Sequence, residues 1–347
     1  QELPGVTFTS PPSAVAYRLY GDDCLIMTSG TDGMYVWDGV SPARKVDSPM
    51  ITSMAMSGER MFACVAGESN AVYFSDDLDP TEGTVGSGRG GFVQLLDERG
   101  KLLRALDFLG YVYLVREYGV SRISGTYDAS ALTAANLYVA GGALQAGGAA
   151  VCGDFIMLAG ADGLYAFDGY SASRRLRAVR LSPSPEASGV YADGKYYLAA
   201  KTGSEGEVND TLIVYDIAEN TFSLSRIAIK RLCKLGGDVY AVLADGRTGR
   251  VAKCGAVLGE PLVKVWESGA LDYGTPEVKT LSEVTLRTEG DAELSVTADG
   301  RTRTFSVKGG GVRRVRPGLS GRVARIKLTS LSPGANISRL SVLVRRR

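Results

Sequence analysis

Short apolar runs separated by glycine-rich turns recur along the first two thirds of the chain. Residues 26–39 (IMTSGTDGMYVWDG) return as residues 156–169 (IMLAGADGLYAFDG). Each copy consists of an apolar run, a Gly-x-Asp-Gly turn and a second run with alternating aromatic residues. Two such runs joined by a tight turn predict a pair of antiparallel strands. The sequence therefore predicts a fold built from repeated hairpins.

Weaker copies of this hairpin occur over residues 61–74, 111–123, 196–215 and 239–252. The expected first strands begin at spacings of 36 to 50 residues, near Leu25, Met61, Tyr111, Phe155, Tyr196 and Val239. A four-stranded propeller blade occupies about 40 to 50 residues. We therefore expect an all-β protein that begins with a six-bladed β-propeller, with Tyr35 and Tyr165 at equivalent positions three blades apart. We also expect residues 11–20 to close the ring by pairing with a blade built from residues 232–262.

The pattern changes after Lys264 to strict alternation of polar and apolar residues, over residues 284–286, 294–296, 305–307, 324–328 and 340–344. Alternation with a period of two is typical of antiparallel strands that bury one face. The expected domains are a β-propeller over residues 1–265 and a small C-terminal antiparallel β domain, sandwich-like, over residues 266–347.

Charge divides the chain near the same place. Residues 301–347 contain 13 of the 39 Lys and Arg and none of the 38 Asp and Glu, so the first 300 residues carry 26 basic against 38 acidic groups. The overall net charge of +1 conceals this polarity. Alternation sends Arg325, Lys327 and Arg339 away from the apolar face of their strands, and the chain ends in Arg345, Arg346 and Arg347.

These six basic residues form the candidate interaction surface, with an acidic protein subunit or nucleic acid as its partner and a merely solvated face as the alternative. Phe305 is the only aromatic residue in the basic segment, so the stacking platforms of single-stranded nucleic-acid binders are missing.

Catalytic candidates are few, because the chain contains no histidine. Every scheme that needs a histidine base or metal ligand is excluded. The five cysteines include no Cys-x-x-Cys pair. A carboxylate pair for glycoside hydrolysis remains, with candidates at Asp22, Asp23, Asp76, Asp77, Asp79, Glu205 and Glu207. Most of these lie in turn contexts that favour a structural role. We expect no catalytic residue, no cofactor and no metal site.

The longest run of small residues, 139–151, is broken by two Gly-Gly pairs, so no membrane insertion is expected.

Several segments resemble the β-propeller proteins of bacteriophage and prophage tails. The similar segments are Val72–Pro80 (VYFSDDLDP), Gly100–Leu106, Tyr113–Gly125, Asp162–Gly169 and Trp266–Gly274. The resemblance implies a structural virion protein of the tail hub, nozzle or packaged-DNA stabilisation type, present as a ring of copies below the portal. It also implies contacts with further copies, with other tail or portal proteins and with DNA.

The sequence thus favours a non-enzymatic structural component of a virion that forms a ring or hub through propeller discs. The alternative is a glycan-binding or glycan-cleaving β-propeller, with Tyr118, Tyr170 and Tyr191 as stacking surfaces.

Overall fold

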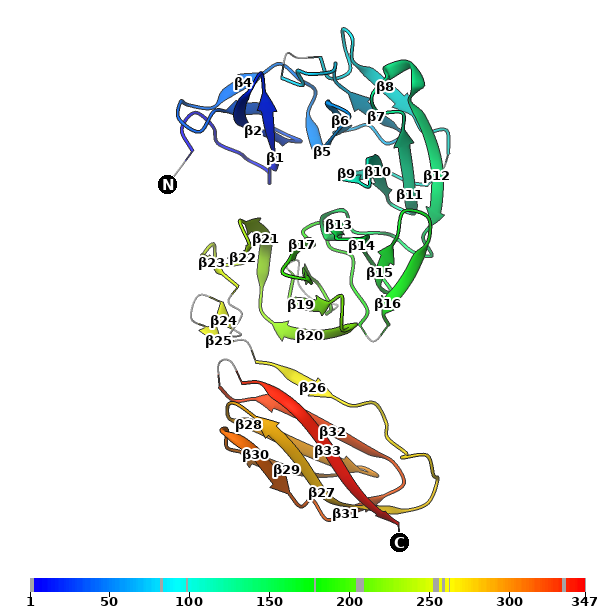
Figure 1. The fold of residues 1–347 in the computed structure, drawn as a ribbon, viewed down its shortest axis with the longest axis vertical. Helices are drawn as coiled ribbons and strands as arrows, with labels where there is room; N and C mark the ends of the chain where they lie inside the picture. The colour runs from blue at the N-terminus through cyan, green and yellow to red at the C-terminus, as the bar shows by residue number, and fades with distance from the viewer. Residues whose placement is uncertain are drawn as a thin grey trace. The chain divides into compact units, whose positions relative to one another are not determined.

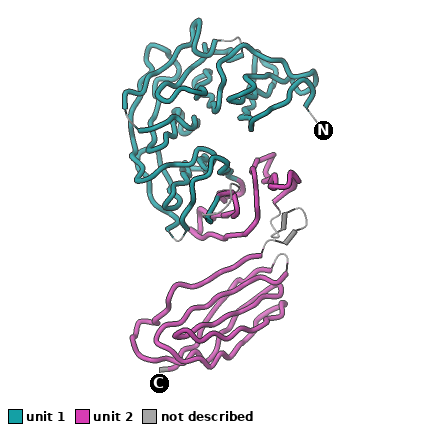
Figure 2. Tube along the Cα trace, turned by 180° about the vertical axis from the view of Figure 1, so that it is seen from behind, with its two compact units in different colours: residues 1–191, 201–205 teal, residues 192–200, 206–347 magenta. Residues whose placement is uncertain are grey.

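The computed structural model describes residues 3–81, 84–97, 99–177, 179–203, 209–251, 256–257, 260–261, 263–332 and 335–346. Apart from two 3-10 turns, Ala129–Ala131 and Ala146–Gly148, the regular elements in these ranges are β-strands (Figure 1). The described chain separates into two compact units, residues 1–191 with 201–205 and residues 192–200 with 206–347 (Figure 2). The domain boundary expected near residue 265 stays a prediction. No helix in the described part of the chain is long and apolar enough to span a membrane.

Antiparallel sheets follow one another along residues 13–250, each with its strands in chain order. The first is β1 (Ser13–Leu19), β2 (Asp22–Ser29), β3 (Gly33–Trp37) and β4 (Arg44–Val46). The second is β5 (Ile51–Ser57), β6 (Arg60–Val65), β7 (Ala71–Phe74) and β8 (Gly91–Gln94). The third is β9 (Leu102–Phe108), β10 (Tyr111–Arg116), β11 (Gly119–Ser124) and β12 (Thr133–Val139).

The series continues through the second half of this region. The fourth sheet is β13 (Ala150–Cys152), β14 (Phe155–Gly160), β15 (Gly163–Phe167) and β16 (Ala172–Leu176). The fifth is β17 (Ser188–Ala192), β18 (Lys195–Ala200), β19 (Thr211–Asp216) and β20 (Thr221–Arg226). A three-stranded sheet, β21 (Ile229–Leu235), β22 (Asp238–Leu243) and β23 (Thr248–Arg250), is followed by the short pair β24 (Ala256–Val257) and β25 (Glu260–Pro261).

Within the first unit, each sheet packs against the next. In β6, Met61 and Ala63 join a cluster with residues of the first sheet, whereas Phe62 and Cys64 join a cluster with residues of the third. Strand β10 likewise divides alternate residues between its two neighbouring sheets. Strands buried on both faces need apolar residues at every position, which explains the continuous apolar runs in the sequence. The all-β, propeller-like arrangement expected from the repeats is therefore present.

The structure shows which strands of each sheet form the repeated hairpin. The starts near Leu25, Met61 and Phe155 fall in β2, β6 and β14, the second strands of their sheets. The hairpin is therefore formed by the second and third strands, and the first strand of the sheet precedes it. Tyr35 and Tyr165 are each the third residue of the third strand, in the first and the fourth sheet, as expected.

The predicted closure by residues 11–20 stays a prediction, because it joins residues of the two compact units. Strand β1 pairs antiparallel with β2, from Ser13 opposite Thr28 to Leu19 opposite Asp22. It is the first strand of its own sheet, because the short turn at Tyr20 and Gly21 folds it directly onto the following residues.

The C-terminal strands form two further sheets that share one hydrophobic cluster. One sheet has the order β26 (Val265–Glu267), β32 (Ala324–Ser330), β28 (Ala292–Ala298) and β29 (Arg301–Val307). In the other, β27 (Lys279–Thr288) lies between β33 (Ile337–Arg346) on one side and β30 (Gly311–Val315) and β31 (Leu319–Gly321) on the other. The buried leucine, valine and isoleucine residues alternate along these strands, as the period of two predicted.

Candidate interaction surface

The basic residues singled out from the sequence lie on two different sheets. Arg325 and Lys327 belong to β32, whereas Arg339 and Arg345 belong to β33. All four side chains are exposed, and they alternate with buried positions in β32 and with half-buried positions in β33. The side chain of Arg346 and all of Arg347 lie outside the described residues. Strand pairing therefore does not bring the predicted residues onto one sheet face.

The outer face of the C-terminal sheet that contains β32 is rich in hydroxyl groups, and its basic residues have polar neighbours. Lys327 lies between Ser295 on β28 and Glu267 on β26. Arg325 lies opposite Thr297. Hydroxyl pairs join β28 to β29, with 3.0 Å between Ser295 Oγ and Thr304 Oγ1 and 2.8 Å between Thr297 Oγ1 and Thr302 Oγ1. A carboxylate from outside the basic segment thus faces Lys327.

The outer face of the C-terminal sheet that contains β33 is different, because two arginines lie opposite each other on neighbouring strands. Arg339 on β33 lies directly opposite Arg287 on β27, and both side chains are exposed. Two rows further along β33, Leu343 is 52% exposed. Val312 of β30, opposite Arg287, is 57% exposed. The face therefore combines positive charge with exposed apolar groups.

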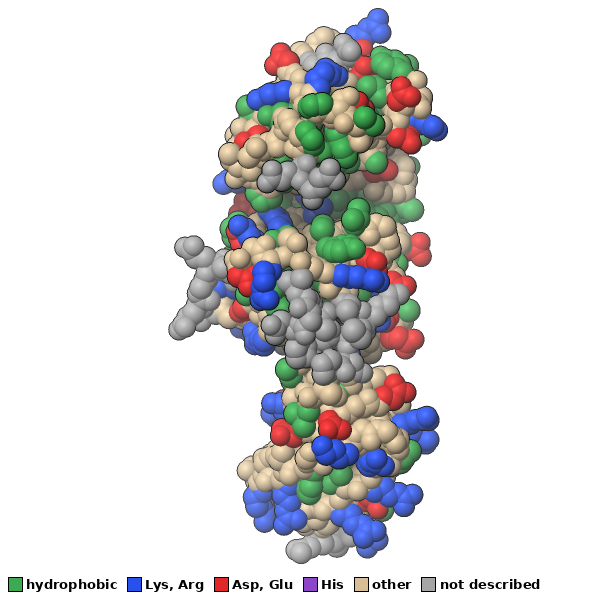
Figure 3. Space-filling model, turned by 90° about the vertical axis from the view of Figure 1, so that its left-hand side faces the viewer, with side chains coloured by type: hydrophobic (Ala, Val, Ile, Leu, Met, Phe, Trp, Pro, Cys, Tyr) green, Lys and Arg blue, Asp and Glu red, His purple; other side chains and the backbone are tan. Residues whose placement is uncertain are grey.

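Among the described residues of β27, β30 and β33, Glu283 has the one carboxylate, and this group is already engaged. Glu283 Oε1 lies 3.8 Å from Arg314 Nε, and Glu283 Oε2 lies 3.7 Å from Arg316 Nε. Among the described residues, no carboxylate forms an ion pair with the remaining three arginines of this face. We call Arg287, Arg314, Arg316, Arg339 and Arg345 the arginine face. Lys and Arg side chains are prominent on the surface formed by the C-terminal strands (Figure 3).

Sequence reasoning missed Arg287, Arg314 and Arg316, although a signal for Arg287 was present. The alternation at residues 284–286 continues to Arg287, which places that side chain on the polar side of its strand. Its position opposite Arg339 depends on pairing between strands far apart in the sequence, and one-residue shifts within that pair occur near Leu281 and directly after Arg287. No local pattern specifies such a register.

The carboxylates proposed for glycoside hydrolysis occupy turns or the protein surface. Asp76 Oδ1 accepts a hydrogen bond from the amide of Asp77 at 2.8 Å, and Asp79 Oδ1 accepts one from the amide of Thr81 at 2.8 Å. Asp22 and Asp23 are exposed at the start of β2, and Glu205 and Glu207 lie outside the described residues. Among the described residues, no three histidine, cysteine or carboxylate groups are gathered as a metal site would require.

The three tyrosines proposed as sugar platforms are not gathered in one place. Tyr170 is 69% exposed, and its ring lies 5.5 Å from the guanidinium of Arg122. That guanidinium also lies 4.5 Å from the ring of Tyr111, at the start of β10. Tyr118 follows the far end of the same strand, and Tyr191 belongs to β17. The Tyr170 ring thus packs on an arginine at one end of the sheet, away from Tyr118.

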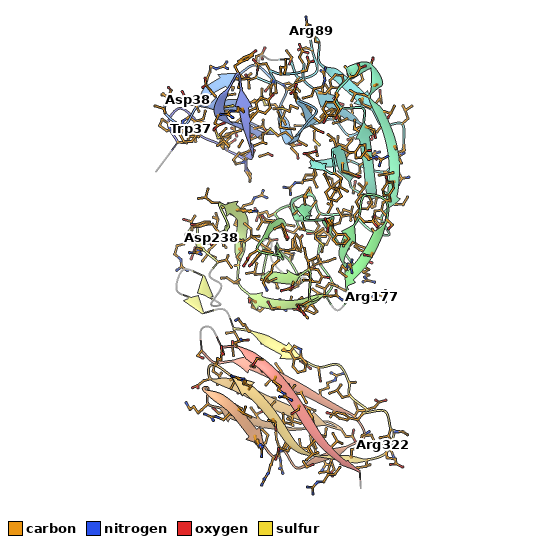
Figure 4. All side chains as sticks on the ribbon, in the orientation of Figure 1. Trp37, Asp38, Arg89, Arg177, Asp238 and Arg322 are labelled. Atoms are coloured by element: carbon orange, nitrogen blue, oxygen red, sulfur yellow. The ribbon has the colours of Figure 1, made fainter. Side chains whose placement is uncertain are left out.

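The aspartates of the repeated motif hold turns. Asp38, which follows Trp37 at the end of β3, accepts hydrogen bonds from the amides of Val40 and Ser41 at 2.8 and 2.7 Å (Figure 4). Asp168 accepts the equivalent bonds from Tyr170 and Ser171 at 2.9 and 2.8 Å. These bonds lower the pKa of both carboxyl groups. The aspartates at the end of the recurring motif therefore stabilise the turns that follow β3 and β15.

Asp32 has an additional role that the sequence did not indicate. Its carboxylate accepts hydrogen bonds from Ser29 Oγ at 2.6 Å and from Thr9 Oγ1 at 2.7 Å. These bonds hold the pKa of Asp32 well below its usual range. The N-terminal segment is thereby tied to the turn between β2 and β3.

No known protein family and no curated protein matches the sequence. The solved structures with similar folds include AztD from Citrobacter koseri, with 13% identity over 91% of this chain and 92% of that chain and a TM-score of 0.45. The extracellular domain of BT4673 from B. thetaiotaomicron is 12% identical over 84% of this chain and 39% of that chain, with a TM-score of 0.42. Sqt1 from Saccharomyces cerevisiae is 10% identical over 87% of this chain and 92% of that chain, with a TM-score of 0.39. Similarity at this level assigns neither a family nor a function.

Proposed function

We propose that this protein is a structural, non-enzymatic component of a phage-type virion. In this proposal, residues 1–265 form a six-bladed β-propeller and residues 266–347 form a basic β-sandwich through which copies associate. The observation that carries the proposal is the arginine face, where the described residues include five exposed arginines and one carboxylate, that of Glu283. The similarity of residues 72–80 and 266–274 to phage tail propellers supports the choice of particle.

The consecutive sheets of residues 13–250 support a rigid scaffold. Packed propeller blades protect their own strand edges, and a ring of such discs needs no catalytic group to enclose a channel. The basic segment carries +13 and the preceding 300 residues carry a net charge of −12. The arginine face of one copy against the acidic body of the next would form a head-to-tail contact, which closes into a ring when the rotation fits. Neighbouring tail or portal proteins and DNA are the further partners in this proposal.

Electron microscopy of the purified protein, alone and mixed with the products of neighbouring genes, tests the assembly. The proposal predicts closed rings at low salt. It also predicts dispersal at high salt, because the Debye length falls from about 10 Å at 0.1 M to about 3 Å at 1 M. Single particles at every salt concentration, with and without the neighbouring proteins, would contradict the proposal. Hydrolysis of any member of a polysaccharide panel would favour the glycosidase alternative instead.

A further inference from the structure

Strand β33 forms an edge of its sheet. It is ten residues long and pairs with β27 from Arg346 opposite Lys279 to Ile337 opposite Thr288. No other described strand pairs with it. One row of its backbone N–H and C=O groups is therefore without a strand partner. Long open edges accept an added strand, either by unwanted association or in specific peptide recognition.

The side chains of β33 determine what such a strand would meet. Leu340 and Val342 pack on the hydrophobic cluster between the two sheets. Arg339, Ser341, Leu343 and Arg345 alternate with them and form the outer row. Arg339 and Arg345 are six residues apart, which is about 20 Å along a strand. An added strand would thus find an arginine near each end of the row and the half-exposed Leu343 between them.

Pairing of β33 with its own copy is disfavoured by these arginines. An antiparallel pair centred on Val342 would place Arg339 opposite Arg345 of the second copy at both ends. Like charges directly opposite each other destabilise a strand pair. Charged side chains on edge strands commonly prevent such self-association.

The edge strands of a second copy offer few carboxylates to this site. Among the edge strands whose side chains the structure describes, β9 and β26 hold one carboxylate each, Asp107 and Glu267. A strand with several carboxylates at this edge would therefore come from another protein, whereas the contact between copies proposed above concerns the face of the sheet. Nucleic acid fits this site less well, because the outer positions of β27, β30 and β33 include no aromatic side chain and do include exposed apolar groups.

We propose that β33 binds an extended acidic segment of a partner protein as an added strand. The backbone of the segment would complete the hydrogen bonding of the edge, and its Asp or Glu side chains would lie beside Arg339 and Arg345. A carboxylate beside Arg339 would also relieve the repulsion between Arg339 and Arg287. The inference rests on the proposed function only in assigning a protein partner to the arginine face, and it does not require rings.

The test is fluorescence anisotropy of a labelled synthetic peptide binding to the full-length protein. The peptide is ten residues long, to match β33, with Glu alternating with Thr and Val. Changing both Arg339 and Arg345 to Glu should weaken binding by about tenfold or more. The matched control changes Arg325 and Lys327 to Glu, which reverses the same charge on the other sheet and should alter binding by less than about twofold. Circular dichroism confirms that both variants fold.

A second probe separates strand addition from simple charge attraction. The same peptide with N-methyl groups on alternate amides keeps its charge but cannot pair along one edge. We expect it to bind about tenfold or more weakly, because main-chain hydrogen bonds supply affinity in strand addition. Equal binding of the two peptides, or no binding of either, would overturn the inference. Tighter binding of a single-stranded oligonucleotide of the same charge would overturn it in favour of nucleic acid. Rings that form normally while the peptide fails to bind would leave the proposed function standing without this inference.

Discussion

Arg339 on β33 lies directly opposite Arg287 on β27, and both guanidinium groups are exposed. On the other sheet of the C-terminal strands, Lys327 lies opposite Glu267. The two outer faces therefore differ in electrostatic balance, although both carry basic residues. Like charges directly opposite each other weaken a strand pair, so the arginine pair opposes folding of the free protein. An acidic partner would remove this repulsion.

Changing Arg287 to Glu should stabilise the free protein. The substitution replaces a repulsive cross-strand pair with an attractive one, which should raise the free energy of unfolding by about 0.2 to 1 kcal/mol at low salt. Urea unfolding at low and high salt measures the effect, which should shrink as salt screens the charges. Lys327→Glu is the control with the opposite sign, because it creates a like-charge pair with Glu267. A shift in the same direction for both variants would contradict this account.

Arg116 should be far more important for stability than the exposed arginines. Its side chain is fully buried at the end of β10, where it pairs with Asp97 and donates hydrogen bonds to Asn70 Oδ1 at 2.8 Å and to the carbonyl of Gly100 at 2.9 Å. Arg116→Met should lower the free energy of unfolding by about 1 to 3 kcal/mol, because it removes the hydrogen bonds that the buried guanidinium donates, whereas the partly buried Asp97 keeps its ion pair with Arg99. The exposed Arg18→Met is the control and should cost less than about 0.5 kcal/mol. Similar midpoints in thermal unfolding of the two variants would show that the Arg116 network is not needed.

The tether between Asp32 and Thr9 should weaken in acid. Hydrogen bonds from Ser29 and Thr9 lower the pKa of Asp32 in the folded state. Its stabilising contribution is therefore fully present above the unfolded pKa of about 3.9 and is lost as the pH falls through the lower folded value. Asp32→Asn should increase amide hydrogen exchange in residues 3–12 at neutral pH. Asp162→Asn, the equivalent change in the second copy of the motif, should leave exchange in that segment unchanged, and an increase there would argue against a specific tether.

Thiol labelling should distinguish the buried Cys64 and Cys152 from the exposed Cys233. Burial raises the pKa of the Cys64 and Cys152 thiols to about 12. Cys233 is exposed. At a pH of about 8, iodoacetamide should therefore modify Cys233 in the native protein, with Cys64 and Cys152 reacting only after unfolding. Mass spectrometry of the labelled peptides gives the result, and comparable native labelling of Cys64 and Cys233 would contradict the packing of β6.

The sequence predicted the hairpins well, because tight turns and apolar runs are local features. It did not predict which sheet each side chain faces. Ile26 and Ile156 occupy the same place in the repeated motif, yet Ile26 joins a cluster with the next sheet and Ile156 joins one with the preceding sheet. In the first copy Ser29 pairs with Gly33, whereas in the second Gly160 pairs with Gly163, so the turn is one residue shorter. A shift of one residue reverses the facing of a strand.

For the candidate interaction surface, too, the sequence predicted local features but not the long-range pairing of strands. Alternation correctly placed Arg325, Lys327 and Arg339 away from the apolar positions, because that depends only on the period of each strand. Their division between two sheets depends on long-range pairing, since β32 joins β28 and β33 joins β27. The neighbours that set their electrostatic environment, Glu267 and Arg287, both lie outside residues 301–347. The charge of that segment alone could not show that Lys327 faces a carboxylate and Arg339 does not.

Sedimentation velocity of three proteins tests most directly whether the arginine face is an assembly surface. The proteins are the wild type, a variant with Arg287, Arg339 and Arg345 changed to Glu, and a control with Arg325 and Lys327 changed to Glu. At about 0.1 M salt, the wild type and the control should sediment as oligomers that dissociate near 1 M, and the arginine-face variant should sediment as a folded monomer at both concentrations. Identical profiles for all three proteins would show that the arginine face is only solvated and would contradict the account.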